Sequence, residues 1–253
     1  MSCLYLNFVL LSLYLKTMIK YLKTALHFDI VPLQEEVARL SDNYWKEHYN
    51  KAHYQGDWSI LSLRAIGGNS ENVCSIPSDL GMSYSDTPLM DQCPLLRSAI
   101  DAFACEKTSV RLMKLNAGAL IKEHTDQDMH MEAGEARLHI PIQTNADVAF
   151  YIQEDRIPMQ EGECWYLNLS LPHRVHNAGS TDRIHLVIDC IVNDWVKDLL
   201  QDTSLFRKDI DALPAHAFSR EDQQKIIGEL RQMNTPASLQ QAALMEIALL
   251  QSS

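Results

Sequence analysis

The sequence predicts a mainly β protein, an antiparallel sandwich or barrel with helices before and after it. Between residues 58 and 195, short alternating apolar runs are separated by turn residues such as Gly67-Gly68, which is typical of antiparallel strands. On both sides of this region the apolar residues recur with helical spacing,. Residues 58–195 are therefore expected to form the core, with helical segments at residues 18–57 and 196–253.

Residues 1–17 form an apolar leader that fits no common targeting signal. The apolar run is about a dozen residues long, and a helix needs roughly 20 to cross a membrane. It also has neither the basic start nor the small-residue cleavage site of a signal peptide,. We expect a disordered leader or a misassigned start, with the domain beginning at Met18, and no membrane span.

The expected elements follow in chain order. Leu33, Val37, Leu40 and Tyr44 recur at helical spacing, so residues 29–44 are predicted to be a helix, with Pro32 in its first turn,. The predicted strands are residues 58–66, 109–115, 137–143, 148–153, 164–171 and 183–192. The predicted C-terminal helices are residues 195–202, 219–233 and 238–251, with Ser219 and Ser238 as N-caps,.

Charge and cysteine usage exclude several classes of partner. The net charge is -11 and no Lys/Arg cluster is present, which argues against a nucleic-acid or anionic-membrane surface. A small-molecule or peptide partner is favoured. The six cysteines form no CxxC pair, a pattern typical of reduced, buried thiols in a cytoplasmic protein.

Two predicted strands each place an arginine and a histidine on one face. Strand side chains alternate, so Arg137 and His139 lie opposite Leu138, Ile140 and Ile142 in the first of them. In the second, Arg183, His185, Val187 and Asp189 lie opposite Ile184, Leu186 and Ile188. The ordinary explanation for such a strand is that its polar face is exposed to solvent. That explanation is weakened because two strands show the same Arg/His pattern.

A histidine and an aspartate two residues apart raise the question of a metal. His124 and Asp126 point the same way from the end of one strand,. Two histidines and a carboxylate on one face of a metal leave positions open, which suits non-heme Fe(II). The third ligand must come from another strand, where both His173 and His176 are available. Spacing alone leaves these two open.

Taken together, these motifs resemble a known family. His-Thr-Asp at 124–126, RLHIPIQTN, the Glu161-Gly162 turn and LPHRVHNAGSTDRIHLVIDC resemble the aspartyl/asparaginyl β-hydroxylase family of Fe(II)/2-oxoglutarate dioxygenases, which includes bacterial type II proline hydroxylases. The resemblance covers residues 58–195. It implies a double-stranded β-helix, that is, a jelly-roll or cupin-like barrel.

The resemblance also implies roles for individual residues. His124, Asp126 and His173 would bind iron, and His173 is favoured over His176 because the arginine that binds 2-oxoglutarate in the family lies ten residues after the distal histidine, as Arg183 does here. Two further residues would help to hold the co-substrate: Arg137 and His139. Weaker candidates for substrate binding lie on the earlier strands: Trp58, Arg64 and Arg111.

The implied reaction consumes O2 and converts 2-oxoglutarate to succinate and CO2 while an unactivated C–H bond of the substrate is hydroxylated. No catalytic residue beyond the metal ligands is implied. The helical tail after residue 195 resembles that of free-amino-acid hydroxylases, so a small amino acid or a derivative is the expected substrate. The alternatives are an Asp/Asn β-hydroxylase acting on a peptide or carrier-bound residue, a hydrolase or isomerase on a cupin-like barrel, and a non-catalytic ligand-binding barrel.

Overall fold

The computed structural model describes residues 17–73, 83–126, 129–201, 206–211 and 220–234, together with residues 239, 242, 243, 245–247 and 249. Residues 1–16 of the expected leader lie outside the described residues. The same is true of the two expected N-caps, Ser219 and Ser238.

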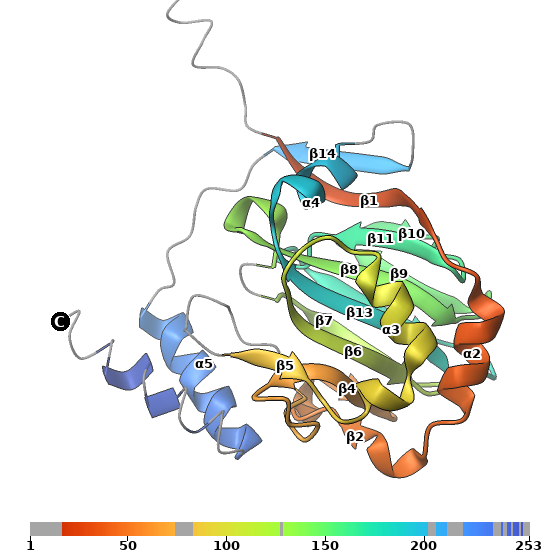
Figure 1. The fold of residues 1–253 in the computed structure, drawn as a ribbon. Coiled ribbons are helices and arrows are strands. Elements are labelled where there is room, and N and C mark those ends of the chain that lie inside the picture. Colours follow the sequence, from red (N-terminus) through yellow and green to blue (C-terminus); the bar gives the residue numbers. More distant parts are fainter. Residues whose placement is uncertain are drawn as a thin grey trace, which may run out of the picture.

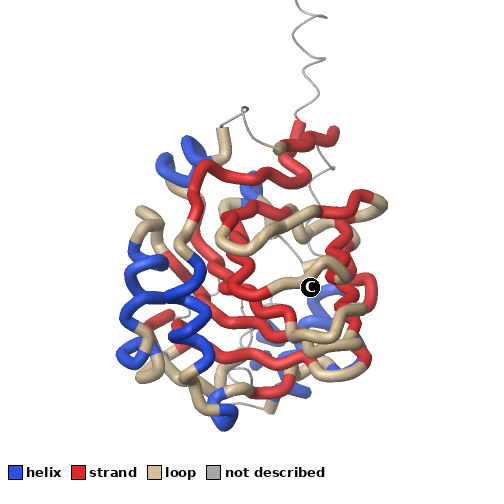
Figure 2. Tube along the Cα trace, turned by 90° about the vertical axis from the view of Figure 1, so that its right-hand side faces the viewer, coloured by secondary structure: helices blue, strands red, loops and turns tan. Residues whose placement is uncertain are grey.

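Two antiparallel sheets form the core, as the sequence predicts (Figures 1 and 2). The larger sheet has the order β14-β1-β11-β8-β13-β6-β4-β2, with β5 paired to β4, and the smaller has the order β10-β9-β12-β7-β3. From β6 to β13 the chain passes back and forth between the two sheets, except that β9 and β10 form a hairpin within the smaller sheet, and this is the topology of a double-stranded β-helix. The strands are β1 (Thr17–His27), β2 (Lys46–Glu47), β3 (Tyr54–Gln55), β4 (Trp58–Ile66), β5 (Tyr84–Asp86), β6 (Lys107–Leu115), β7 (Leu120–His124), β8 (Glu135–Gln143), β9 (Val148–Ile152), β10 (Asp155–Ile157), β11 (Glu163–Leu167), β12 (His173–Asn177), β13 (Arg183–Ile191) and β14 (Arg207–Asp211).

Helices cover the outer face of the larger sheet (Figure 1). The α-helices are α2 (Ile30–Ala38), α3 (Pro94–Asp101), α4 (Asp194–Leu199) and α5 (Arg220–Met233), and the 3-10 helices are η1 (Asp42–Tyr44), η2 (Lys51–His53), η4 (Met90–Gln92) and η5 (Met131–Ala133). The apolar faces of α2, α3 and α4 pack on the expected apolar faces of β8 and β13, made of Leu138, Ile140, Ile142, Ile184, Leu186 and Ile188. The predicted alternation of these two strands is thereby confirmed.

The inner faces of the two sheets meet in a second apolar cluster. It includes Trp58, Phe150, Trp165 and Val187, which come from four different strands. The arginines and histidines of β8 and β13 lie on this inner side, so the face is not solvated. They are buried, and they therefore need partners or ligands.

The structure differs from the sequence prediction at the N-terminal segment, where residues 18–57 were expected to be helical. Residues 17–27 instead form β1, which pairs with β11 on one side and with β14 on the other. Its alternation divides Tyr21 and Leu22 between the inner and outer apolar clusters. As a strand paired on both sides, this segment packs side chains against both apolar clusters. A helix on the surface would lack these contacts.

The predicted helix at residues 29–44 is shorter in the structure. It ends at Ala38, and a separate 3-10 turn follows from Asp42 to Tyr44. The Ser41 side chain accepts a hydrogen bond from the Asn43 backbone N–H. Serine, aspartate and asparagine compete with the helix for backbone groups in this way, which explains the break.

The C-terminal region is only partly helical. α5 lies within a predicted helix and α4 overlaps one, beginning one residue earlier, but Arg207–Asp211 forms β14 against β1. This strand is short and charged, so it lacks the alternating apolar residues from which a strand is predicted. The helix α5 packs on Tyr49, Ile66 and Tyr84 at the far edge of the larger sheet (Figure 1).

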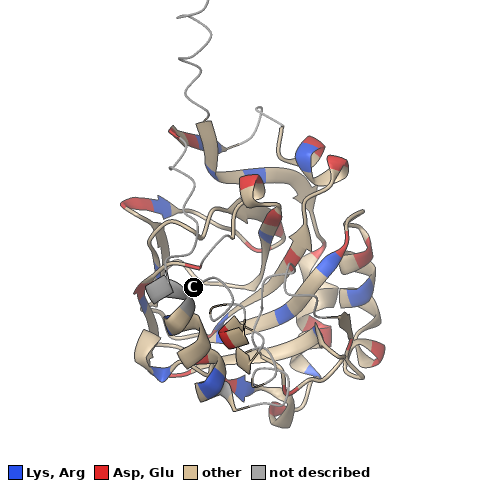
Figure 3. Cartoon of the chain, turned by 90° about the vertical axis from the view of Figure 1, so that its left-hand side faces the viewer, with Lys and Arg blue, Asp and Glu red and all other residues tan. Residues whose placement is uncertain are grey.

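Charged residues of both signs are spread over many elements. In Figure 3, segments with Lys and Arg lie among segments with Asp and Glu. No helix among the described residues is long and apolar enough to cross a membrane. The four described cysteines, Cys93, Cys105, Cys164 and Cys190, are free thiols.

Candidate metal and co-substrate site

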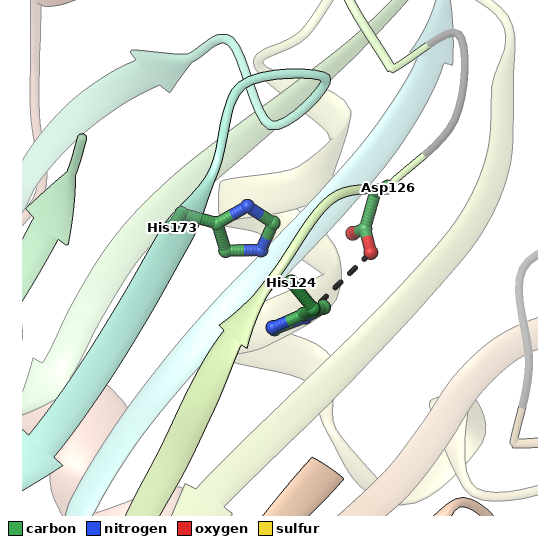
Figure 4. Close-up of side chains that lie close together, drawn as sticks. All are labelled: His124, Asp126 and His173. Carbon is green, nitrogen blue, oxygen red and sulfur yellow. Dashed lines mark ion pairs between the residues drawn. The ribbon is translucent and has the colours of Figure 1, made fainter.

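His124, Asp126 and His173 converge between the two sheets (Figure 4). One potential ligand atom from each lies within 4.8 Å of the others. His124 ends β7 and His173 begins β12, and the two are paired across these neighbouring strands. The backbone N–H of Asp126 donates to the Leu169 carbonyl at 2.8 Å, which fixes the loop that carries the carboxylate. Pairing and loop anchoring thus preorganise the three groups.

Hydrogen bonds to the backbone set the tautomers of both histidines. Nδ1 of His124 lies 2.8 Å from the Lys122 carbonyl, and Nδ1 of His173 lies 3.0 Å from the Leu171 carbonyl. A carbonyl only accepts, so each Nδ1 carries the proton and each Nε2 keeps its lone pair. This is the arrangement of metal-binding histidines whose second nitrogen is held by an outer partner.

Burial keeps His173 neutral. It lowers the pKa of His173 to about 4, because a charged imidazole is disfavoured away from water. A neutral imidazole is the form that binds a metal. The exposed side chain of His176 lies outside the cluster, so the geometry favours His173 of the two histidines that the sequence left open.

The two oxygens of Asp126 face different neighbours. Oδ1 lies 3.8 Å from His124 Nε2, and Oδ2 accepts a hydrogen bond from Arg137 Nη1. Burial by itself would raise the pKa of Asp126, but the charge of Arg137, with smaller contributions from His173 and His124, holds the pKa below its ordinary value,. Asp126 is therefore an anion with one oxygen bound and the other directed toward the histidines.

Arg183 is a buried cation without an acidic partner among the described residues. It is 2% exposed, its Nη2 donates to His185 Nδ1 at 2.8 Å, and its Nε has no hydrogen-bond partner. Burial lowers the pKa of Arg183 to about 9. Unpaired buried charge is costly. A guanidinium in this state is a ready receptor for a carboxylate, which it can bind through two parallel hydrogen bonds.

Phe150 lies between Arg183 and His173. The guanidinium carbon of Arg183 lies 5.9 Å from the centre of the Phe150 ring, and the His173 ring stacks on Phe150 with a centroid distance of 6.2 Å. His139 contacts the same ring edge-on at 5.9 Å. One candidate metal ligand, His173, and the candidate carboxylate receptor, Arg183, therefore share one neighbour.

His139 and His185 lie beside Arg183. Their Nδ1 atoms are 3.4 Å apart, and Nε2 of His139 has no hydrogen-bond partner among the described residues. Burial, followed by the charge of Arg183, holds the pKa of both histidines well below the ordinary value. Both rings are therefore neutral, and His139 keeps a free nitrogen for a ligand.

Arg137 has partners other than those expected of a co-substrate residue. Its Nε and Nη2 donate to Asp189 at 2.5 and 3.0 Å, and its Nη1 donates to Asp126. Each nitrogen thus already bonds to a carboxylate. Of the predicted co-substrate set, Arg183 and His139 keep unpartnered nitrogen atoms, whereas Arg137 keeps none.

The three weaker candidates separate in the structure. Arg111 is buried on the inner side, where Nη2 donates to Asp189 at 2.7 Å and Nε has no partner. Trp58 is also on this side, stacked on His48 with ring centroids 3.6 Å apart, and its Nε1 has no partner. Both have an unpartnered N–H among the described residues.

Arg64 does not join this cluster. Its guanidinium pairs with Asp86 at 2.8 Å and donates to the backbone carbonyls of Lys107 and Tyr84. These bonds tie β4 to β5 and to the start of β6. These bonds give Arg64 a structural role, and the substrate contact expected from the sequence stays a prediction.

Sequence reasoning missed two histidines and underrated one aspartate. His48 stacks on Trp58, and the His53 ring lies 5.4 Å from that of His124. Both belong to the irregular segment before β4, where no periodicity shows which side chains face inward. Asp189 shares the inner face of β13, so its alternation with Arg183 and His185 was the available sign of its position.

The chain is similar to known proteins over most of the region that carries this site. The model of the family described as aspartyl/asparaginyl beta-hydroxylase matches residues 29–192, more than half of the chain. The L-proline cis-4-hydroxylase of Rhizobium meliloti (strain 1021) is 29% identical over 169 residues, which are 64% of this chain and 57% of that protein. The chain thus spans less than two thirds of that relative's length.

Solved structures with a similar fold include two oxygenases. One, from Burkholderia pseudomallei, is described as a 2OG-Fe(II) oxygenase family oxidoreductase, with 13% identity, a TM-score of 0.40, and coverage of 63% of this chain and 77% of the other. Another is the viral collagen prolyl hydroxylase of Paramecium Bursaria Chlorella virus-1, with 10% identity, a TM-score of 0.37, and coverage of 68% and 97%.

Proposed function

Because the chain belongs to the aspartyl/asparaginyl beta-hydroxylase family, we propose that it is an Fe(II)- and 2-oxoglutarate-dependent dioxygenase that hydroxylates a small amino acid or an amino-acid derivative. One observation carries the proposal: one ring nitrogen from each of two histidines and one carboxylate oxygen converge within 4.8 Å, and the buried Arg183, without an acidic partner in the described part of the chain, contacts the same Phe150 ring as His173.

The donor set fits ferrous iron. Two neutral imidazoles and one carboxylate on one side of an ion leave positions open for a co-substrate and O2. His124, His173 and Asp126 would hold the metal. When bound, Fe(II) and 2-oxoglutarate supply the oxidation, in which O2 is consumed, 2-oxoglutarate yields succinate and CO2, and a C–H bond of the substrate is hydroxylated.

The side chains around the metal have separate tasks. Arg183 would bind the distal carboxylate of 2-oxoglutarate, a task that a lysine could not reproduce with the same geometry. His139 would add a hydrogen bond through its free nitrogen. The apolar cluster that contains Phe150, Trp165 and Val187 excludes water from the reacting end.

The charges of the site favour a substrate that carries a carboxylate. Among the described inner residues, three guanidiniums (Arg111, Arg137 and Arg183) stand against two carboxylates (Asp126 and Asp189). The charges of Fe(II) and the 2-oxoglutarate dianion cancel, so one guanidinium remains without a matching carboxylate. A free amino acid brings an α-carboxylate beside its ammonium group, whereas a residue within a peptide chain brings a carboxylate only if its side chain is acidic. Both this charge pattern and the similarity to an L-proline hydroxylase support a free amino acid as substrate. Arg111, whose Nε has no hydrogen-bond partner among the described residues, would bind its carboxylate.

A turnover assay tests the proposal. Anaerobically reconstituted Fe(II) protein is exposed to O2 with 2-oxoglutarate and a panel of free amino acids, beginning with L-proline, beside short Asp- and Asn-containing peptides. Substrate-stimulated succinate formation with a free amino acid, lost in His173→Ala, is the expected result. Stimulation by peptides alone would favour the peptide β-hydroxylase, and failure of the protein to bind 2-oxoglutarate would contradict the dioxygenase.

A further inference from the structure

We propose that Arg137, anchored by Asp189, is a positioning residue that holds Asp126 so that only one of its oxygens is offered to the metal. This inference rests on the proposed function, because it assigns a task toward the same metal centre. It replaces the co-substrate role that the sequence resemblance implies for Arg137.

Arg137 bridges two carboxylates with different positions in the fold. Nε and Nη2 form a two-point bond to Asp189 at 2.5 and 3.0 Å, and Nη1 donates to Oδ2 of Asp126. Arg137 and Asp189 are a cross-strand pair of β8 and β13 in the middle of the larger sheet. Asp126 follows β7 of the smaller sheet. The bridge therefore ties the loop of one sheet to the centre of the other.

Asp189 makes this arrangement rigid. It is 0% exposed, its two oxygens accept from Arg137, and Oδ2 also accepts from Arg111 at 2.7 Å. A planar guanidinium held at two points has little freedom to rotate. The remaining Nη1 is consequently directed at one place, which Asp126 Oδ2 occupies.

As a result, the two carboxylate oxygens of Asp126 have different roles. Oδ2 is engaged by Arg137, while Oδ1 lies 3.8 Å from Nε2 of His124. A carboxylate whose Oδ2 is held in this way binds through Oδ1 alone, which keeps a coordination position open. Outer partners of this kind set the orientation of metal ligands.

The charges are consistent with a permanent contact. An arginine next to a dication would be repelled in a low-dielectric interior, but Asp189 offsets the charge of Arg137 from the opposite side. The bridge can therefore remain in place when the metal binds. The co-substrate then depends on Arg183 and His139, which keep unpartnered nitrogens in the described part of the protein.

The test separates metal affinity from co-substrate affinity. Binding of Mn(II), a redox-stable substitute for Fe(II), is measured by calorimetry for the full-length protein and for Arg137→Lys, Arg137→Gln and Asp189→Asn. Binding of 2-oxoglutarate is then measured at saturating Mn(II). Arg64→Gln, which breaks an ion pair with Asp86 away from the cluster, is the matched control.

The expected result is a 10- to 100-fold loss of Mn(II) affinity in Arg137→Gln and Asp189→Asn, the range for lost outer partners of metal ligands. Arg137→Lys keeps one charged donor, so its loss should be smaller. Affinity for 2-oxoglutarate should stay within about twofold, and Arg64→Gln should change neither constant. The visible bands of Co(II)-loaded Arg137→Gln should weaken, because a carboxylate free to bind through both oxygens raises the coordination number.

Two outcomes would overturn the inference. Unchanged Mn(II) affinity in folded Arg137→Lys and Arg137→Gln would show that Asp126 needs no positioning. If the Arg137 variants lost affinity for 2-oxoglutarate but not for Mn(II), Arg137 would be assigned to co-substrate binding instead. Asp189→Asn removes the charge that two buried guanidiniums share, so this variant could fail to fold. In that case the two Arg137 variants alone test the inference. Failure of the proposed function would give a different result: the wild-type protein would then bind no Mn(II) that is lost in His173→Ala.

Discussion

His124 and His173 lie opposite each other on neighbouring antiparallel strands, with ring centroids 4.2 Å apart. Both Nδ1 atoms are held by backbone carbonyls, so both Nε2 atoms are free to bind a metal. Loss of either ring removes one of the three convergent groups. The strand pairing therefore positions the two histidines, while the loop after β7 supplies Asp126.

The first prediction concerns the choice between two histidines. His173→Ala should abolish stoichiometric Mn(II) or Fe(II) binding, because one of the three ligands is lost. His176→Ala should keep most of it, because the exposed His176 points away from the cluster. Calorimetric titration of both variants checks this. The reverse ranking would show that the strand register is incorrect.

The second prediction sets stability against function at Arg183. Arg183→Met should raise the free energy of unfolding of the ligand-free protein by about 1–3 kcal/mol, because it removes an incompletely paired buried cation. Urea unfolding gives this value. The wild type should gain about 2.7 kcal/mol at 2-oxoglutarate concentrations 100 times the Kd, measured with Mn(II) present, and the variant should gain none. If ligand-free Arg183→Met were less stable than the ligand-free wild type, the destabilisation assigned to the buried Arg183 charge would be contradicted.

The third prediction concerns acid stability. Burial, more than the nearby charges, lowers the pKa of His48 to about 3, and its Nδ1 accepts a hydrogen bond from the Asn50 backbone N–H at 3.3 Å. The unfolded histidine titrates near 6.5. Between these values the unfolded state binds the extra proton, so stability falls as pH decreases from about 6.5 toward 3.

One proton corresponds to about 1.4 kcal/mol per pH unit. His48→Asn should therefore flatten the pH dependence of unfolding by up to this slope. The same measurement on His176→Gln, which alters an exposed ring, is the control and should leave the slope as it is. An unchanged slope in His48→Asn would mean that His48 is protonated in the folded state.

The fourth prediction separates two arginines that the sequence could not rank. Arg111→Gln should raise the KM of the amino-acid substrate about tenfold or more, since a charged hydrogen bond contributes about 1.5–3 kcal/mol. Arg64→Gln should leave KM unchanged, because Arg64 bonds to Asp86, Lys107 and Tyr84. Steady-state succinate formation measures both. Equal effects would assign Arg64 to the substrate after all.

The alternating strands were the most predictable part of the fold. Leu138, Ile140 and Ile142 alternate with Arg137 and His139 over one strand, and that pattern has one explanation when both faces are buried. The strand β1 was missed because its pairing with β11 and β14 depends on residues far away in the chain. Local periodicity contains no information about such partners.

The candidate site was predictable in its residue types but not in its pairings. The spacing of His124 and Asp126 indicates a common direction, and the two Arg/His strands indicate one inner face. No sequence pattern shows that the nitrogens of Arg137 donate to Asp189 and Asp126. Nor does any pattern show that Arg183 has no bond to an acidic residue among those that the structure describes. Those differences arise from the register between β8 and β13, which only the folded chain defines.

The position of β1 between β11 and β14 also affects how the chain must fold. Lys23 of β1 and its partner Glu163 are 140 residues apart, and β14 follows later still. At ribosomal speeds of about 5–20 residues per second, the first strand waits roughly 7–28 seconds for its neighbours. During that time its backbone edges are unpaired, a state that invites association with other chains. Nascent-chain crowding and chaperone supply, more than the stability of the finished barrel, should therefore limit the yield of folded protein, because long-range strand pairs form late.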